Sequence, residues 1–90
     1  MTDPLAIQRR RLHFRSWHRG TREADLILGR FADAHLAGFS PEQLDRYAAL
    51  LEKSDPDIYG WLTGRLQVPV AIDNDVFRLL KEFNLRDSAP

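Results

Sequence analysis

The chain contains no cysteine, and its 90 residues include only five glycines, none of them clustered. The absence of thiols excludes disulfides, a cysteine nucleophile, iron–sulfur clusters and most structural zinc sites. Neither a G-x-G-x-x-G nor a G-x-x-x-x-G-K-[ST] sequence is present, which excludes the common phosphate-binding loops. We therefore expect no tightly bound dinucleotide and no metal.

Long apolar runs are also missing, since none approaches the ~20 residues that span a bilayer. The N-terminal segment lacks the apolar stretch of a secretory signal, and Asp3, Pro4 and the scarcity of serine are unlike a transit peptide. We expect no membrane insertion. A chain of this length is predicted to form one domain, residues 1–90, with one core and little room for a deep active-site pocket.

The formal net charge is zero, but the charges are unevenly distributed. Residues 1–30 carry seven arginines against three acidic residues, a net +4, and residues 31–90 carry six basic against ten acidic residues, a net −4. A basic segment of this kind suits an acidic partner, a phosphate-bearing ligand or nucleic acid. The acidic residues 31–90 would repel phosphates. We therefore keep nucleic-acid binding only as an alternative to a protein partner. The candidate residues for nucleic-acid binding are Arg9, Arg10, Arg11, Phe14, Arg15 and Trp17.

Helical periodicity fills the intervals between the glycine and proline breaks. The pattern predicts an all-α fold, a compact five-helix bundle in a single domain, with a polar, frayed tail over about 86–90. Residues 65–72 have no partner strand and are predicted to form an extended connection packed on the bundle. The predicted helices cover residues 4–17, 21–37, 41 to about 51, 56–63 and 74–84. Their apolar residues are Leu5, Leu12 and Phe14; Ala24, Ile27, Leu28, Phe31 and Ala34; Leu44, Tyr47, Ala48 and Leu51; Ile58, Trp61 and Leu62; Val76, Leu79, Leu80 and Phe83.

Capping residues mark the ends of these helices. Ser40 and Gln43 flank Pro41-Glu42 in the form of a capping box, with proline at the first helical position. Gly38 suits a left-handed C-terminal cap for the second helix, and Gly64 ends the fourth. Asp73 is the predicted N-cap of the fifth helix.

No group of residues indicates catalysis or a metal centre. His13 and His18 are five residues apart and lie on different faces of a helix, and His35 has no histidine or cysteine nearby. Ser16 is close to His18 in sequence, but nothing marks an oxyanion site or a nucleophile elbow. We expect no catalytic residue, no metal site and no enzymatic activity.

The segment Arg19-Gly20-Thr21-Arg22-Glu23 joins the first two predicted helices. In a structural interpretation Gly20 breaks the chain and Glu23 lies at the positive end of a helix dipole. In a functional interpretation Gly20 lies in the first helical turn with ordinary dihedral angles, and its missing side chain lets a partner backbone approach. Arg19 and Glu23 would then share the surface beside it, and Arg19 would donate to a partner carboxylate or carbonyl. We favour the functional interpretation.

With its surroundings, this segment resembles the SdhE family, also called succinate dehydrogenase assembly factor 2, over nearly the whole chain. The R-G-x-x-E hallmark of that family is matched by Arg19, Gly20 and Glu23. A second feature, D-P-D followed by an aromatic residue and leucine, is matched by Asp55-Pro56-Asp57 and Trp61-Leu62. R-G-x-x-E alone is weak, because two of its five positions are free, whereas both motifs at this spacing are fairly specific.

The resemblance implies an assembly factor that promotes covalent attachment of FAD to the flavoprotein subunit of succinate dehydrogenase, and in some bacteria of fumarate reductase. It implies that FAD belongs to the partner, and that the location is the bacterial cytoplasm, or the mitochondrial matrix for a eukaryotic relative. Ala24 departs from the larger apolar residue common in the family, which affects packing. An antitoxin-like protein is a further alternative, because members of the family have carried that label. The implied partner-binding residues are Arg19, Gly20 and Glu23, with Arg15, His18, Arg22, Asp55 and Asp57 as further candidates.

Overall fold

The computed structural model describes residues 3–87, which form helices and connections without a strand. The predicted all-α fold with five helices is confirmed over this range. In chain order the elements are α1 (Pro4–Trp17), α2 (Arg22–His35), a 3₁₀ helix η1 (Leu36–Gly38), α3 (Pro41–Leu51), α4 (Asp55–Leu62) and α5 (Asp75–Asp87). None of the described helices is long and apolar enough to cross a membrane.

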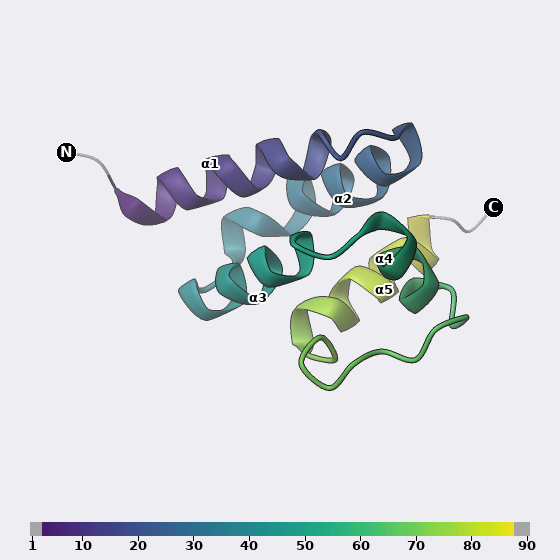
Figure 1. The fold of residues 1–90 in the computed structure, drawn as a ribbon. Helices are drawn as coiled ribbons and strands as arrows, with labels where there is room; N and C mark the ends of the chain where they lie inside the picture. The colour runs from purple at the N-terminus through teal and green to yellow at the C-terminus, as the bar shows by residue number, and fades with distance from the viewer. Residues whose placement is uncertain (1–2, 88–90) are drawn as a thin grey trace.

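One hydrophobic core joins all five helices. α1 packs along α2, and α5 contacts both α2 and α3 (Figure 1). Each helix contributes at least one side chain that is no more than 6 % exposed, namely Leu12, Phe31, Tyr47, Trp61 and Leu80 in chain order. α4 and α5 lie at the end of the molecule away from the start of α1 (Figure 1).

Most residues of the predicted apolar stripes are buried or partly buried, but the stripes are incomplete, since Ala32 of α2 and Leu50 of α3 are also buried. Phe14 is 61 % exposed and Ala34 is also exposed, whereas Phe77, outside the predicted stripe, is buried. Phe77 is buried because α5 packs against two helices, so its apolar face is wider than one stripe.

The predicted left-handed cap at Gly38 is wrong. α2 ends two residues earlier than predicted, and the chain continues into η1, in which Gly38 keeps a negative φ. The guanidinium of Arg9 reaches across from α1 and donates to the Leu36 carbonyl at 3.2 Å and to the Phe39 carbonyl at 3.0 Å. Carbonyls after α2 therefore accept from a side chain of α1. The predicted glycine cap would instead have paired such carbonyls with backbone amides.

The N-terminal caps are confirmed for α3 and shifted for α4. The Ser40 hydroxyl accepts from the Gln43 amide at 3.2 Å and the Gln43 side chain accepts from the Ser40 amide at 3.0 Å, which is the predicted capping box. α4 begins one residue earlier than predicted, because Ser54 is its cap and accepts from the Asp57 amide at 3.3 Å.

The cap of α5 is Asn74, and the prediction of Asp73 is wrong. The Asn74 side chain accepts from the Phe77 amide at 3.1 Å, whereas the Asp73 carboxylate accepts from Arg78 at 3.3 Å. α5 also continues to residue 87, three residues past its predicted end. The frayed tail was predicted to begin at about residue 86, which is wrong for residues 86 and 87 because they belong to α5; residues 88–90 lie outside the described residues.

The connection between α4 and α5 is only partly extended. Gly64 ends α4 with φ +80°, as predicted. The Pro69 carbonyl then accepts from the amides of Ile72 and Asp73, both at 2.9 Å, which forms a turn within the predicted extended segment. Ile72 is buried under this turn, while Val70 is 94 % exposed.

Candidate functional site

The turn between α1 and α2 orients the first motif. The Thr21 hydroxyl accepts from the Ala24 amide at 3.3 Å and caps α2, so α2 begins after Gly20. Gly20 has φ +109°, and a Cβ there would meet no atom within 4 Å. The prediction of ordinary helical dihedral angles at Gly20 is therefore wrong. The glycine is required by the backbone, since L side chains rarely adopt this conformation.

The same turn is fixed by close packing of α1 on α2. Gly29 in α2 lies directly under the Trp17 ring, and a Cβ on Gly29 would come within 2.2 Å of that ring. The Trp17 indole N–H donates to the Asp33 carboxylate at 3.2 Å. The end of α1, and with it the direction in which the chain enters the turn, is held against α2.

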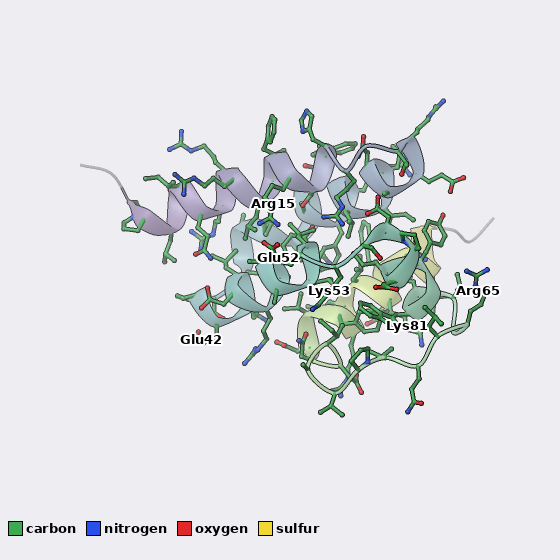
Figure 2. All side chains as sticks on the ribbon, in the orientation of Figure 1. Arg15, Glu42, Glu52, Lys53, Arg65 and Lys81 are labelled. Atoms are coloured by element: carbon green, nitrogen blue, oxygen red, sulfur yellow. The ribbon has the colours of Figure 1, made fainter. Side chains whose placement is uncertain are left out.

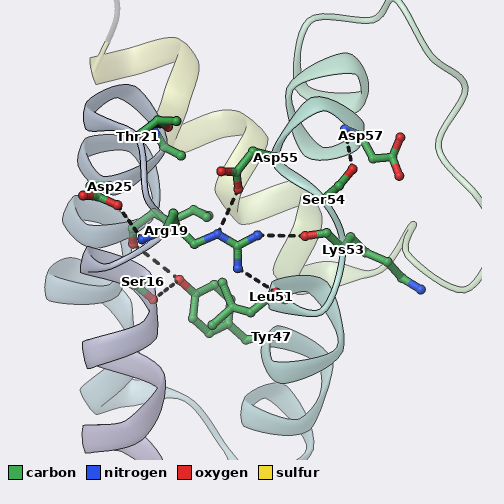
Figure 3. Close-up of polar contacts among 12 residues, drawn as sticks. Ser16, Arg19, Thr21, Asp25, Tyr47, Leu51, Lys53, Ser54, Asp55 and Asp57 are labelled. Atoms are coloured by element: carbon green, nitrogen blue, oxygen red, sulfur yellow. Dashed lines mark hydrogen bonds and ion pairs between the residues drawn. The ribbon is translucent and has the colours of Figure 1, made fainter.

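Arg19 lies inside the molecule, and the prediction of a surface position is wrong. Its side chain is only 12 % exposed. Its guanidinium donates to the Asp55 carboxylate at 2.9 Å, to the Leu51 carbonyl at 2.6 Å and to the Lys53 carbonyl at 2.7 Å (Figure 3). Each of the three nitrogens therefore has an acceptor within the chain, so the side chain is engaged in the fold instead of standing free on the surface for a partner carboxylate.

The position of Arg19 follows from the charges of two helix ends. Leu51 and Lys53 supply carbonyls at the negative C-terminal end of α3, where a cation is stabilised. Asp55 stands at the N-terminal end of α4, where an anion is stabilised. The Arg19 amide also donates to Asp25 of α2 at 2.6 Å. One residue thus ties the α1–α2 turn to α2, α3 and α4.

A buried polar pair lies next to Arg19. The hydroxyls of Ser16 and Tyr47 are 2.6 Å apart, and the Ser16 hydroxyl also donates to the Leu12 carbonyl at 2.7 Å (Figure 3). Burial raises the pKa of Tyr47 to about 12, although the Ser16 hydrogen bond and the charge of Arg19 act in the opposite direction. Tyr47 is therefore neutral at physiological pH, and Ser16 is buried away from any substrate.

A second link between the two motif segments lies nearer the surface. The Tyr59 hydroxyl of α4 donates to the Glu23 carboxylate of α2 at 3.2 Å. Glu23 is exposed, as predicted, and Tyr59 is 36 % exposed. Partial burial, then the negative charge of Glu23 and the hydrogen bond to it, raises the pKa of Tyr59. Among the described residues Glu23 makes no contact with Arg19; one oxygen of its carboxylate is held by Tyr59, and the other accepts no hydrogen bond from them.

Two open grooves flank the Glu23–Tyr59 link. The first, of about 450 Å³, brings together Thr21, Arg22, Glu23, Ala24, Asp55, Pro56 and Tyr59. The second, also about 450 Å³, is lined by Glu23, Leu26, Ile27, Arg30, Tyr59, Thr63 and Asn84. We call the surface that carries both grooves the α2–α4 face. It unites the candidates Arg22, Glu23 and Asp55, and it adds Tyr59.

The remaining candidates lie around this face. Asp57 is exposed on α4, and its side chain makes no hydrogen bond with the described residues. Arg15 is turned toward α3, where it pairs with Glu52 at 3.0 Å (Figure 2). The His18 ring stacks on Phe14 at a centroid distance of 3.9 Å, and its Nδ1 lies 2.7 Å from the Phe14 carbonyl.

Tyr59 is a residue that sequence reasoning did not single out. Its signal was the spacing of the two motifs, because Tyr59 follows Asp55 by four residues just as Glu23 follows Arg19 by four. Asp55 and Tyr59 lie one above the other on α4 because they are four residues apart on a helix, while Arg19 lies in the α1–α2 turn just before the first turn of α2, which carries Glu23. Once Arg19 pairs with Asp55, Glu23 and Tyr59 are placed next to each other.

The basic residues of α1 are divided in their roles. Arg9 and Arg15 are bound to neighbouring segments, whereas Arg10 and Arg11 make no hydrogen bond or ion pair with the described residues. His13 pairs with Asp33 at 2.5 Å. Within residues 3–87, no three histidine or acidic side chains are close enough together to hold a metal ion.

Comparison with known proteins finds a family and several relatives. The family model described as flavinator of succinate dehydrogenase matches residues 10–84. The FAD assembly factor SdhE of Acetobacter pasteurianus is 45 % identical over 67 residues, which cover 74 % of this chain and 62 % of that protein. The mitochondrial succinate dehydrogenase assembly factor 2 of Debaryomyces hansenii is 40 % identical over 84 residues, 89 % of this chain and 59 % of that protein.

A mitochondrial succinate dehydrogenase assembly factor 2-A of Drosophila yakuba is also 40 % identical, over 82 residues that cover 89 % of this chain and 51 % of the relative. The chain thus spans between about half and two thirds of the length of these relatives. Both motif segments lie inside the matched residues 10–84.

Proposed function

Because this chain belongs to the family of flavinators of succinate dehydrogenase, we propose that it is an assembly factor that promotes covalent attachment of FAD to the flavoprotein subunit of that enzyme. The match over residues 10–84 is the observation that carries the proposal. The flavoprotein subunit of fumarate reductase is a second candidate partner. The nucleic-acid and antitoxin-like alternatives gain no support from the relatives named above.

The proposed mechanism is a shift of population in the partner. The flavin supplies the electrophile, so the bond-forming chemistry belongs to FAD and the flavoprotein. This chain binds best to the partner conformation in which attachment proceeds, and thereby raises the share of that conformation. Each 1.4 kcal/mol of preferential binding raises the ratio about tenfold. No residue of this chain acts as an acid, base or nucleophile, and FAD remains with the partner.

The proposed partner-binding surface is the α2–α4 face. Glu23, Arg22 and Asp57 present charged groups there, and Gly20 is exposed at its edge. Arg19 and Asp55 act beneath the surface, where their ion pair fixes the two helices relative to each other. Arg15 and His18, on the adjoining side of α1, remain candidates for its margin. A bacterial cytoplasm or a mitochondrial matrix is the proposed location, since relatives of both origins are similar.

The test is reconstitution with the apo-flavoprotein subunit of succinate dehydrogenase and free FAD. Covalent flavin is read as fluorescence of the subunit on a denaturing gel. We expect this chain to accelerate attachment, and we expect Glu23→Ala to slow it while leaving the far-UV circular dichroism unchanged. An equal rate of attachment with and without this chain would overturn the proposed function.

A further inference from the structure

The Glu23 carboxylate is held at one oxygen and open at the other. Its Oε2 accepts from the Tyr59 hydroxyl at 3.2 Å. Its Oε1 makes no hydrogen bond with the described residues, and the side chain is exposed. A glutamate on the first turn of a helix ordinarily samples several rotamers. Here one hydrogen bond from another helix selects among them, so the free oxygen keeps a defined direction on the α2–α4 face.

The helix that carries Tyr59 is held in place next to α2. Tyr59 lines both grooves of the α2–α4 face and is only partly exposed. One turn before it on α4, Asp55 is tied to Arg19 at 2.9 Å, so α4 cannot slide along α2 without breaking that pair. The Tyr59 backbone carbonyl accepts from the Thr63 amide at 3.0 Å and from its hydroxyl at 2.9 Å, as the helix continues. The hydroxyl that holds Glu23 is therefore presented from a helix whose position relative to α2 is set by the Arg19–Asp55 pair.

The chemistry of the open oxygen defines what it binds. A carboxylate that accepts from a neutral hydroxyl keeps its full negative charge and its remaining lone pairs. Asp57 on α4 adds a second carboxylate, one that makes no hydrogen bond or ion pair with the described residues, while the negative charge of Asp55 is matched by Arg19. An ammonium or guanidinium group is the complementary ligand.

We propose that Tyr59 is a positioning residue that holds the Glu23 carboxylate toward a basic side chain of the partner flavoprotein subunit. This inference rests on the proposed function and names the partner chemistry at the same face. Lysine and arginine share the required positive charge and donors. Tyr59 acts through Glu23 and donates to no group of the partner.

The experiment is a double-mutant cycle on the full chain, with the dissociation constant for the apo-flavoprotein subunit measured by calorimetry. Tyr59→Phe removes only the hydroxyl and should weaken binding roughly two- to tenfold, because one rotamer-rich side chain must then be ordered on binding. In the Glu23→Gln background the same Tyr59→Phe change should have no further effect. Glu23→Gln should also reduce the salt dependence of binding, since it removes an attractive charge.

Glu42 supplies the matched control. Glu42 and Glu23 both occupy the second position of a helix that begins after a hydroxyl cap, at Ser40 and Thr21 respectively. Glu42 lies at the end of α3 remote from α4 (Figure 2). Glu42→Gln therefore removes the same charge from the same place on a helix dipole, and it should leave binding and its salt dependence unchanged.

A measurement without the partner tests the hydrogen bond itself. Glu23→Gln should lower the pKa of Tyr59 toward the ordinary tyrosine value, because a negative neighbour is removed. Ultraviolet titration of tyrosinate in the Tyr47→Phe background isolates Tyr59. An unchanged titration would overturn the inference even if the wild type binds the flavoprotein.

The remaining outcomes separate the inference from the proposed function. Binding by Tyr59→Phe equal to wild type, or losses from Tyr59→Phe and Glu23→Gln that add, would overturn the positioning role while the assembly function stands. Failure of the wild-type chain to bind the apo-flavoprotein would overturn both. Tyr59→Phe, Glu23→Gln and Glu42→Gln should all melt close to wild type, because the two glutamates are exposed and Tyr59→Phe removes only a hydroxyl.

Discussion

The two motif segments, residues 19–23 and 55–59, contact each other at two depths in the molecule. We call the shielded contact the inner level and the exposed contact the outer level. At the inner level Arg19 and Asp55 form an ion pair whose side chains are 12 % and 24 % exposed. At the outer level, four residues later on each segment, Tyr59 donates to an exposed Glu23. Burial decides between them, since a shielded charge must be satisfied within the chain whereas an exposed one remains available to a partner.

The first motif thus contains a residue that is bound within the fold, Arg19, and an exposed residue, Glu23, that we propose for the interface. A loss of activity after mutation of Arg19 would report on the arrangement of helices, whereas a loss after mutation of Glu23 would report on the contact itself. Stability and binding measured together distinguish the two, because the fold is affected in the first case only.

The largest expected effect is at the inner level. Arg19→Ala should lower the free energy of unfolding by about 3 kcal/mol, because it leaves a shielded Asp55 and the Leu51 and Lys53 carbonyls without their donor. Urea denaturation followed by far-UV circular dichroism measures this loss.

The control for Arg19 is the arginine one turn earlier. Arg15 also reaches toward the end of α3, where it pairs with Glu52, but the two side chains are 39 % and 70 % exposed (Figure 2). Arg15→Ala should cost less than about 1 kcal/mol. Similar stabilities of Arg19→Ala and wild type would show that Arg19 is not a structural link in solution.

The next-largest effect on stability is expected at Gly20, in the turn between Arg19 and Glu23. Gly20→Ala should lower the free energy of unfolding by about 1–2 kcal/mol, because its φ of +109° is strained for any L side chain. Thermal and urea melts check the change. Gly38→Ala is the matched control, since a Cβ there also meets nothing within 4 Å but φ is not positive. Gly38→Ala should be neutral or slightly stabilising. Equal melts for the two variants would contradict the backbone explanation.

Local patterns predicted the fold well where one helix face and one cap decide the outcome. The Ser40 capping box, the glycine stop at residue 64 and the core position of Trp61 all follow from a few neighbouring residues. The cap at Gly38 was mispredicted because the groups that replace it come from Arg9, 27 and 30 residues away. A long-range side-chain contact of this kind leaves no mark in local periodicity.

The candidate site was predicted in composition but not in depth. The family resemblance implied Arg19 and Glu23 as partner-binding residues, with Asp55 as a further candidate, and the structure brings their segments together. The sequence could not show that the Arg19 side chain is turned inward, because an arginine beside a glycine break can equally lie on the surface. Tyr59 was not identified as a site residue, because an aromatic residue on a short helix resembles a core residue.

A smaller effect is expected at an exposed ion pair between α1 and α2. Hydrogen bonds from His13 and then from Trp17 hold the pKa of Asp33 below its usual value. A lowered carboxyl pKa in the folded state stabilises the fold above the unfolded pKa near 4, and this stabilisation is lost as the pH falls through the folded value. Both side chains of the His13–Asp33 pair are about half exposed, so the gain is up to about 1 kcal/mol.

Asp33→Asn checks this prediction. Its stability deficit relative to wild type should be full at pH 6 and should shrink as the solution is acidified below about pH 4. Asp45→Asn is the control, because the Asp45 carboxylate is exposed and accepts at 3.2 Å from the neutral side-chain amide of Gln8. A deficit for Asp33→Asn that stays constant at acid pH would contradict the ion-pair explanation.

The smallest effect on stability belongs to the outer level, where the largest effect on function is expected. Glu23→Gln and Glu42→Gln should each cost about 0.3–0.5 kcal/mol, because each removes a negative charge from the first turn of a helix. Only Glu23→Gln should slow FAD attachment to the flavoprotein subunit, measured as covalent flavin fluorescence. If Glu23→Gln instead destabilised the chain as strongly as Arg19→Ala, the two levels would share one structural role. If both glutamate variants supported attachment equally, the α2–α4 face would not be the partner surface. A stability loss no larger than that of Glu42→Gln, together with a loss of attachment, is the combination that assigns the inner level to the fold and the outer level to the partner.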